Sequence, residues 1–419
     1  MIKILDSTLR EGEQTPGVYF DVHIKAAIAD MLDDVGIDII ETGHPAVTPE
    51  IRRSVEEIAH KGLKAVIGAH ARSIEKDVDL ALECGVNFLG VFYCVSDQRL
   101  NHHATPLNRA VDKIVSVIRY AREQKPALTI RYTPEDTVRT QWENVSTAAA
   151  AAVRAGANVI SIADTTGYMI PGTSRSMYDY VRRLKDDLAA KDLYPEIAVH
   201  CHNDRGLALA NALDAYRAGV DIIDVTVLGI GERAGLVDLA TLLSVLVSDF
   251  DEGERWDMKR IPELYRLVSQ YAGISVPVNF PITGKNAFTH CAGVHTQAAI
   301  KNPIHYQSIE PELVGRKPEI SLDHMSGMAA VKYCMESIGE SECAEDTDFV
   351  AKILEKVKAV GQTGRVVDLI ELGYIVRHLK RSLRRPGALF EKTAPGPRKN
   401  FCLGEYYENR VLALADQER

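Results

Sequence analysis

The sequence predicts an α/β protein, a (β/α)8 TIM barrel followed by a smaller, mostly helical C-terminal region. Two observations support this fold. Short runs rich in β-branched residues alternate with helical segments between residues 2 and 228. The 419 residues also exceed the roughly 250 that a barrel requires, which leaves room for an appendage.

Eight short apolar runs are the predicted strands of the barrel. They cover residues 2–9, 37–41, 64–71, 88–95, 128–133, 158–163, 196–201 and 221–228. Because both faces of a parallel sheet are covered, its strands are typically continuous apolar runs like these.

Helical segments separate the predicted strands. Apolar residues recur at three- and four-residue spacing in segments 21–35, 107–124, 141–154 and 205–218. Several helical segments end at a glycine, as helices commonly do: Gly36, Gly62, Gly85, Gly156 and Gly219. An open doubly wound sheet is the alternative, but the first strand lacks the glycine fingerprint of that fold. A barrel places its active site at the C-terminal ends of its strands.

The pattern changes beyond residue 247, where an acidic segment and a run interrupted by prolines follow the last strand and helix. We predict four regions: a catalytic barrel (1–255), a linker and lid-like subdomain that includes His295 (256–310), a helical subdomain (311–383) and an irregular tail (384–419). The helical subdomain contains amphipathic helices at 344–360 and 365–383.

Composition excludes several classes of protein. The net charge of -9 argues against nucleic acid or an anionic membrane as the main partner. No apolar run approaches the roughly 20 residues of a membrane helix, and no signal peptide precedes the first strand. The seven cysteines have no paired spacing, which indicates reduced thiols. We therefore expect a cytoplasmic protein that acts on small molecules.

The clearest chemical signal is the His-Cys-His pattern at the end of the seventh strand. Since successive strand residues face opposite sides, His200 and His202 share one face and Cys201 points away. Such a histidine pair also occurs by chance. With Glu11 available after the first strand, however, the three side chains form a set with open positions that suits a catalytic divalent ion, Zn, Mn or Mg.

Four motifs in this order resemble one family. They are DSTLREGEQ from Asp6, HCHND from His200, LGIGERAG from Leu228 and FTHCAGVH from Phe288. The resemblance extends from residue 6 to about residue 339. It is to the metal-dependent enzymes that condense an acyl-CoA with a 2-oxoacid, which include homocitrate synthase and 2-isopropylmalate synthase.

The resemblance implies a role for each matching residue. Acetyl-CoA is the implied co-substrate and a divalent metal the implied cofactor. The implied metal ligands are Glu11, His200 and His202. The implied 2-oxoacid-binding residues are Arg10, Gln14, His70, Arg131, Thr133 and Thr165, of which Arg10 also polarises the carbonyl group.

Catalysis and CoA binding are implied at further positions. His295 and Tyr306 match a catalytic pair that acts on the site of a neighbouring subunit, which implies a homodimer, and Glu135 supports their proton transfer. The residues implied to contact CoA are Gly229, Gly231, Glu232 and Arg233. Their glycine spacing alone suggests only a weak phosphate-binding loop.

His70 favours 2-oxoglutarate as the 2-oxoacid. It matches the histidine that binds the distal carboxylate in homocitrate synthases, whereas an isopropyl group would leave a buried imidazole without a partner. Two segments depart from the homocitrate synthase pattern: residues 41–45 (ETGHP) and 234–239 (AGLVDL). Oxaloacetate, phosphonopyruvate and 2-oxoisovalerate therefore remain alternatives.

Two other classes of function compete with condensation. Hydroxymethylglutaryl-CoA lyases use the same barrel to cleave a carbon–carbon bond, but they contain a cysteine in the loop after the eighth strand, and residues 228–235 contain none. A binding protein on an inactive barrel is disfavoured because every metal and carboxylate position is filled.

Overall fold

The computed structural model describes residues 1–253, 255–302 and 305–383. The chain divides into two compact units, of which the first is Met1–Ser321. The second begins at Leu322 and is described as far as Leu383. The tail predicted to be irregular, 384–419, lies outside the described residues.

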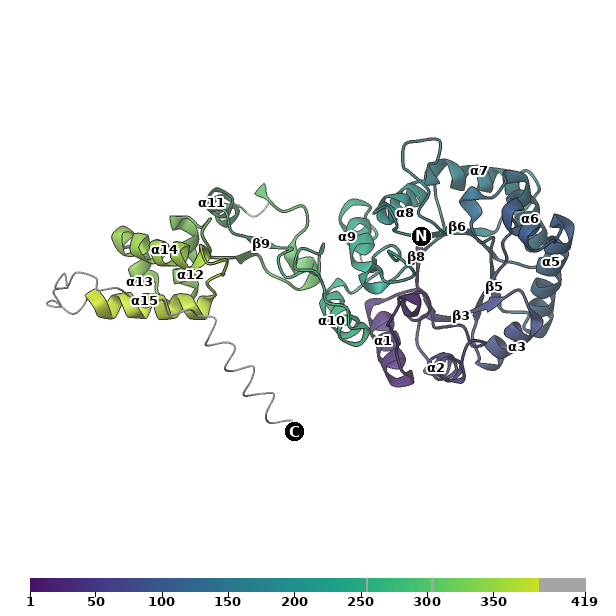
Figure 1. Cartoon of the computed structure of the whole chain (residues 1–419), viewed down its shortest axis with the longest axis horizontal. Helices are drawn as coiled ribbons and strands as arrows, with labels where there is room; N and C mark the ends of the chain where they lie inside the picture. The colour runs from purple at the N-terminus through teal and green to yellow at the C-terminus, as the bar shows by residue number, and fades with distance from the viewer. Residues whose placement is uncertain (254, 303–304, 384–419) are drawn as a thin grey trace, which may run out of the picture. The chain divides into compact units, whose positions relative to one another are not determined.

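Eight parallel strands close into a barrel in chain order (Figure 1). They are β1 (Lys3–Asp6), β2 (Ile39–Glu41), β3 (Val66–Arg72), β4 (Phe88–Phe92), β5 (Thr129–Thr133), β6 (Val159–Asp164), β7 (Glu196–Cys201) and β8 (Ile222–Val225). The first strand closes the barrel by pairing with the last, where Leu5 lies opposite Asp224. The predicted fold class is confirmed, and each strand lies within two residues of its predicted start.

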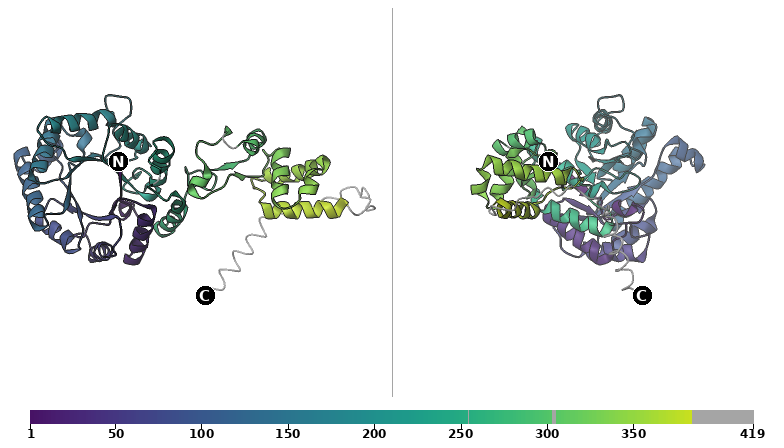
Figure 2. Two further views of the ribbon diagram at one scale, coloured as in Figure 1. Left: turned by 180° about the vertical axis from the view of Figure 1, so that it is seen from behind. Right: turned by 60° about the vertical axis from the view of Figure 1, so that its left-hand side comes forward.

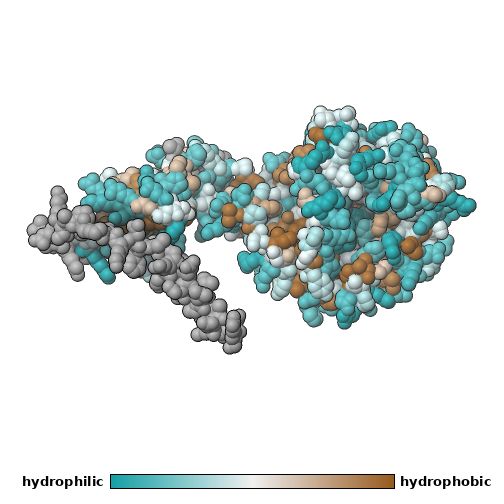
Figure 3. Space-filling model, in the orientation of Figure 1, coloured by the Kyte–Doolittle hydropathy of each residue, from teal (hydrophilic) through white to brown (hydrophobic). Residues whose placement is uncertain are grey.

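Helices surround the strands, as views from the front and from behind agree (Figures 1 and 2). They are α1 (Val22–Val35), α2 (Pro49–Ala59), α3 (Glu75–Glu83), α4 (Asp97–His102), α5 (Leu107–Gln124), α6 (Trp142–Ala155), α7 (Met177–Ala189), α8 (Ala208–Arg217), α9 (Leu239–Asp249) and α10 (Ile261–Ala272). Hydrophilic side chains cover most of the visible outer surface of the barrel, with apolar ones scattered among them (Figure 3).

Helix α1 illustrates why these segments are helical. The Asp21 carboxylate accepts a hydrogen bond from the backbone N–H of Ile24 at 2.9 Å, which satisfies a free N–H group at the helix start. The helix ends at Gly36, whose φ of 95° is left-handed. The residues buried against the barrel are Lys25, Ala26, Ile28, Ala29, Leu32 and Val35. Lys25 is the exception in this apolar stripe and has a role in the site.

The two-residue alternation of the strands stacks the barrel interior in layers. The layer near the N-terminal strand ends is apolar: Leu5, Ile39, Phe88, Val159, Ala198 and Ile222. Two residues further along three of these strands stand Glu41, His200 and Asp224. The apolar layer therefore closes one end of the barrel, and the polar side chains lie on the side of the C-terminal strand ends.

A buried ion network occupies this polar layer. Arg131 donates to both carboxylate oxygens of Asp224, at 3.0 and 2.9 Å, and to Glu41 Oε1 at 2.8 Å. Glu41 Oε2 accepts from Arg10 Nε at 2.6 Å and from the Ser7 hydroxyl at 2.7 Å. Burial alone would raise the pKa of Glu41, but Arg10 and Arg131 hold it well below its usual value. The carboxylate is therefore ionised although it is fully buried.

Asp238 joins the loop after β8 to two helices. As the N-cap of α9 it accepts from the Thr241 N–H at 3.0 Å, and it accepts from the Tyr265 hydroxyl of α10 at 2.6 Å. Burial raises the pKa of Asp238 to about 6 in spite of these hydrogen bonds.

Residues beyond α10 complete the first unit. A short parallel pair joins β9 (Thr289–His290) to β10 (Glu319–Ile320), and α11 (Gly293–Lys301) follows β9. The segment predicted to be a lid, 256–310, thus belongs to the first compact unit. Its motion as a lid remains a prediction.

The second unit is helical, as predicted. Its helices are α12 (Met328–Ser337), α13 (Ser341–Ala344), α14 (Thr347–Gly361) and α15 (Leu369–Leu383). The last two correspond to the predicted pair, and Ile353 and Val376 are among their fully buried residues. In the described part of the chain, no helix combines the length and apolar character that a membrane crossing needs.

Replacing Asp224 with Asn should destabilise the barrel. Arg131 would keep a buried charge with only Glu41 as partner, and removal of one member of such a network typically costs about 3–5 kcal/mol. Denaturant unfolding of D224N measures this loss. The matched control is E196Q, which breaks the half-exposed Lys3–Glu196 pair and should change stability by about 1 kcal/mol or less. Equal stabilities of D224N and E196Q would contradict the role of the network.

Replacing Asp238 with Asn should change the pH dependence of stability. Because the folded pKa of Asp238 is raised from 3.8 to about 6, its contribution is fully present below about pH 4 and is lost as the pH rises through 6. The stability of the wild type relative to D238N should therefore fall by on the order of 3 kcal/mol between pH 4 and 7. Unfolding curves across this range measure the difference; a pH-independent difference would disprove the raised pKa.

Candidate active site

A cavity of about 310 Å³ opens at the C-terminal ends of the barrel strands. Among the residues with predicted roles, those lining it are Arg10, Glu11, Gln14, His70, Arg131, Thr133, Glu135, Thr165, His200, His202 and Glu232. It is also lined by residues with no predicted role: His44, Phe92, Ser161, Ala163 and Asp224. Most side chains of the predicted site are thus brought to one place.

The turn after β1 is fixed by its own short polar side chains. Asp6 accepts from the Thr8 backbone N–H at 2.9 Å and from its hydroxyl at 3.0 Å. The same hydroxyl accepts from the Val227 N–H at 2.8 Å, which ties this turn to the end of β8. The result is a turn that directs Arg10 and Glu11 into the cavity, where their side chains form an ion pair.

Lys25 also stabilises the turn after β1, a role that was not predicted from the sequence. Its buried ammonium group donates to the backbone carbonyls of Leu9 at 2.8 Å and Thr42 at 3.2 Å, and pairs with Glu13 at 2.6 Å. It therefore joins the loops after β1 and β2. Helical spacing places Lys25 on the apolar face of α1, and a lysine at such a position could have indicated a buried partner.

Glu11, His200 and His202 each place a ligand atom within 4.8 Å of the others. Nδ1 of His200 lies 3.0 Å from the Asp224 carboxylate, which leaves Nε2 for a metal and fixes the ring orientation, as carboxylates commonly do for metal-binding histidines. Cys201 is buried and does not line the cavity.

The protonation states of Glu11 and His202 suit a cation. Burial lowers the pKa of His202 to about 3, so the ring is neutral, and its buried Nδ1 has no hydrogen-bond partner among the described residues. Burial alone would raise the pKa of Glu11, but the charge of Arg10 holds it below its usual value. A neutral His202, the His200 imidazole and the Glu11 carboxylate together fit a divalent metal ion.

The charges around the cavity do not balance. The three buried carboxylates of Glu11, Glu41 and Asp224 are paired with two guanidinium groups, those of Arg10 and Arg131, so this ion network has one carboxylate in excess. A divalent cation would reverse the sign, and the site would then attract a carboxylate.

The remaining predicted substrate residues lie further around the barrel: His70 on β3, Thr133 on β5 and Thr165 after β6. The Thr165 hydroxyl accepts from the Asp136 N–H at 3.0 Å, which leaves its own proton for another acceptor. Glu135 pairs with Arg99 at 3.0 Å. Burial and the charge of Arg10 hold the pKa of His70 well below its usual value, so this ring is neutral. Its buried Nε2 has no partner among the described residues.

The predicted catalytic pair does not line this cavity. His295 and Tyr306 contact each other instead, with ring centroids 4.6 Å apart, and both side chains are exposed. An exposed pair is available to another molecule, but its action on a neighbouring subunit remains a prediction.

The loop predicted to bind CoA, residues 229–233, contacts Glu11. The Glu232 N–H donates to Glu11 Oε1 at 3.2 Å, and Arg233 pairs with Asp204 at 2.7 Å. A Cβ at Gly235 would lie 1.7 Å from the Gly229 carbonyl oxygen, so only glycine permits this turn. Of the four predicted residues, only Glu232 lines the cavity, and CoA binding by the others remains a prediction.

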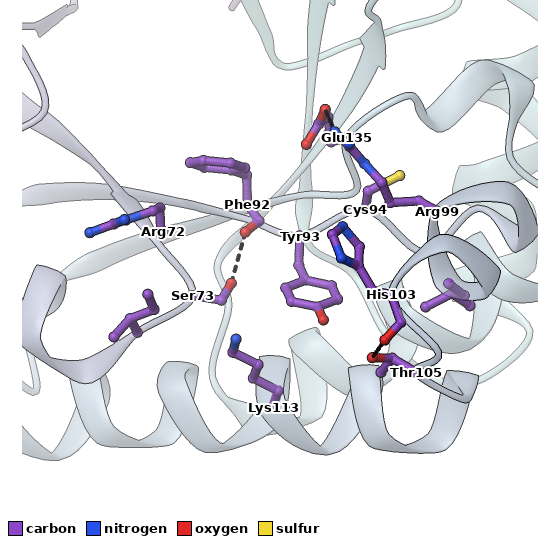
Figure 4. A pocket seen from close by; sticks show the side chains of 12 residues that line it. Arg72, Ser73, Phe92, Tyr93, Cys94, Arg99, His103, Thr105, Lys113 and Glu135 are labelled. Carbon is purple, nitrogen blue, oxygen red and sulfur yellow. Dashed lines mark hydrogen bonds and ion pairs between the residues drawn. The ribbon is translucent and has the colours of Figure 1, made fainter.

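A second cavity, of about 570 Å³, adjoins the first and shares Phe92 and Glu135 with it. Arg99 lies beside Glu135 at one end, and Lys113 points toward Tyr93 and Ser73 at the other (Figure 4). Of its cations, Arg72 ends β3, Arg99 lies on α4 and Lys113 lies on α5, and the periodicity of the sequence does not indicate that they line one cavity. This cavity was therefore not predicted.

Comparison with known proteins identifies the family. The HMGL-like family matches residues 1–268, and the family described as homocitrate synthase post-HMGL domain-like matches residues 282–365. The homocitrate synthase of Pyrococcus abyssi is 40% identical over 357 residues, which cover 85% of this chain and 94% of that protein. The homocitrate synthase of Saccharolobus islandicus is 38% identical over 380 residues, or 89% and 80% of the two chains.

Solved structures show the same fold. The HMG-CoA lyase of Bacillus subtilis is similar with a TM-score of 0.55 and 21% identity over 66% of this chain and 95% of that one. The hydroxymethylglutaryl-CoA lyase of Pseudomonas aeruginosa gives 0.55 and 22%, over 65% and 94%. At this identity the likeness extends to the fold alone. The matching domains and the relatives together show that the chain belongs to the HMGL-like family, in its homocitrate synthase group.

Proposed function

We propose that this protein condenses acetyl-CoA with 2-oxoglutarate and water to give homocitrate and CoA. The observation that carries the proposal is the convergence of Glu11, His200 and His202 beside Arg10 in one cavity. Homologues named homocitrate synthase, at 36–40% identity over most of the chain, support the substrate assignment.

A divalent ion, Zn, Mn or Mg, would be held by Glu11, His200 and His202 and, when bound, would polarise the 2-oxo carbonyl group. Arg10 lies beside this position and is tied to Glu11 and Glu41. Its fixed positive charge would offset the negative charge that develops on the carbonyl oxygen during attack. The Thr165 hydroxyl would donate to the substrate's carboxylate.

Arg131 would act by positioning. Both of its terminal nitrogens are already engaged by Glu41 and Asp224, and Asp224 in turn orients His200. Arg131 would therefore act on the substrate indirectly, by holding Glu41 and Asp224 in place. His70 would contact the distal carboxylate of the substrate, because its buried Nε2 lacks any other partner among the described residues.

The second half of the chemistry requires a carbanion. A base removes a methyl proton from acetyl-CoA, and the resulting enolate carbon forms a bond to the keto carbon while the π electrons of the carbonyl group move to its oxygen, which takes a proton and becomes a hydroxyl group. Water then cleaves the thioester to give a carboxylate and release CoA. We assign the proton transfer to His295 and Tyr306 of a neighbouring subunit, supported by Glu135, and therefore propose a homodimer. A cytoplasmic location fits the composition and, in the described part of the chain, the free thiols of Cys84, Cys94, Cys201, Cys334 and Cys343.

The second cavity is the proposed entry for acetyl-CoA. It adjoins the reaction cavity at Phe92 and Glu135, and Arg72, Arg99 and Lys113 supply positive charge suited to the phosphates of CoA. The loop that contains Gly229, Gly231, Glu232 and Arg233 would also contact CoA, as the family resemblance implies.

An assay of CoA release tests the proposed reaction. Purified protein with a divalent metal and acetyl-CoA should release CoA fastest with 2-oxoglutarate. Oxaloacetate, phosphonopyruvate and 2-oxoisovalerate are the competing acceptors. Fastest release with 2-oxoisovalerate would overturn the substrate assignment. Cleavage of a hydroxyacyl-CoA without release from any acceptor would instead indicate a lyase.

Metal binding can be tested without turnover. Calorimetric titration of the chelator-treated protein with Mn²⁺ or Zn²⁺ should give one site per chain. Loss of a residue that only hydrogen-bonds to a metal ligand weakens metal binding by roughly 10–100-fold. Because E11Q and H202N change the ligands themselves, they should weaken binding by more than this. The matched control is H23N, at an exposed position on α1, which should bind as the wild type does. Unchanged binding by E11Q and H202N would rule out this ligand set.

A further inference from the structure

Two imidazoles share one wall of the reaction cavity. The ring of His44 stacks near that of His70, with centroids 6.3 Å apart and an angle of 26° between the ring planes. His70 is at the same time held edge-on against Phe92, with centroids 4.9 Å apart. All three side chains line the cavity. His44 has no part in the chemistry proposed above.

The backbone around His44 is built to hold it there. The His70 N–H donates to the Gly43 carbonyl oxygen at 2.9 Å, which fixes the loop after β2 against β3. Gly43 has a φ of 155°, and a Cβ there would lie 2.8 Å from Ile51 of α2. Only glycine lets this loop approach the helix so closely. The position of His44 is therefore set by the fold rather than by a flexible loop.

A buried carboxylate orients the His44 ring. Nε2 of His44 lies 3.2 Å from Asp77 Oδ2, and the Asp77 side chain is only 2% exposed. Arg72 holds Asp77 in place with contacts of 2.7 and 3.0 Å. Since Nε2 faces Asp77, Nδ1 is the ring nitrogen left for a ligand. This is the arrangement by which carboxylates orient functional histidines.

The other cationic groups nearby are already engaged. Arg10 is paired with Glu11 and Glu41, and Arg131 with Glu41 and Asp224. A substrate carboxylate distant from the metal ligands therefore has few donors to meet. His70 offers its unpartnered Nε2, and His44 offers Nδ1.

We propose that His44 is a specificity-determining residue that binds the distal carboxylate of a dicarboxylic 2-oxoacid together with His70, with Asp77 as its positioning residue. The proposal rests on the proposed function, because it names how that site selects its substrate. Nε2 of the His44 ring faces Asp77, and Nδ1 would donate a hydrogen bond to the substrate carboxylate.

Two isosteric variants separate the roles of the two ring nitrogens. In H44Q the amide can replace Nε2 and keep the Asp77 contact, but the donor at Nδ1 is lost. In H44N the amide replaces Nδ1 and the Asp77 contact is lost. We expect H44Q to raise the KM for 2-oxoglutarate by about 10-fold or more, as expected for loss of a charge-assisted hydrogen bond. H44N and D77N should raise it less.

The readout distinguishes specificity from a general loss of structure. In H44Q, kcat and the KM for acetyl-CoA should stay within about twofold of the wild type, an estimate consistent with loss of uniform substrate binding. Activity with 2-oxobutyrate, which lacks the distal carboxylate, should not fall. H60Q, at an exposed position beside α2, is the matched control and should behave as the wild type.

Calorimetric binding of 2-oxoglutarate to the metal-loaded protein, without acetyl-CoA, completes the test because it does not require turnover. Tighter binding by the wild type than by H44Q supports the proposal even if no CoA is released, in which case the proposed reaction alone fails. Equal binding and equal KM values for the wild type and H44Q overturn the role of His44, while the condensation reaction stands. A wild type that binds no dicarboxylic 2-oxoacid overturns both.

Discussion

The buried carboxylate of Glu41, held between the guanidinium groups of Arg10 and Arg131, is the interaction on which the rest of the site depends. It joins the end of β2 to β5 and to the turn after β1. Since Glu41 has no exposure to solvent, neither guanidinium can be released without leaving a charge uncompensated in a medium of low dielectric constant. Arg10 is thereby fixed before any ligand arrives, as electrostatic stabilisation of a developing charge requires.

The fold and the histidine pair of the central site followed from periodicity, and the other site residues were implied by the family resemblance. Continuous apolar runs gave the strands, and the two-residue alternation of β7 placed His200 and His202 on one face. The same alternation places Asp224 on the inner face of β8, two residues after Ile222. A single acidic residue in an apolar run does not, however, indicate which residue it pairs with. Arg131 meets Asp224 only because the barrel closes and brings β5 and β8 across from each other.

Contacts between a loop and a helix could not be predicted for a related reason. His44 meets Asp77 of α3, and Arg99 of α4 meets Glu135, through turns whose geometry depends on packing against these helices. Sequence spacing contains no information on such pairs. Lys25 differs, because a lysine on the apolar face of a helix is visible in the sequence, and only its partners, the carbonyls of Leu9 and Thr42, required the structure.

The charge balance links the metal set to the substrate. The buried carboxylates of Glu11, Glu41 and Asp224 outnumber the guanidinium groups paired with them by one, so a dicarboxylic 2-oxoacid should be repelled until a divalent ion is present. Titration of 2-oxoglutarate into metal-free and metal-loaded protein, followed by calorimetry, tests this most directly. Binding should be detectable only in the metal-loaded protein. Equal affinity in both forms would contradict the assignment of this cavity as a metal-dependent 2-oxoacid site.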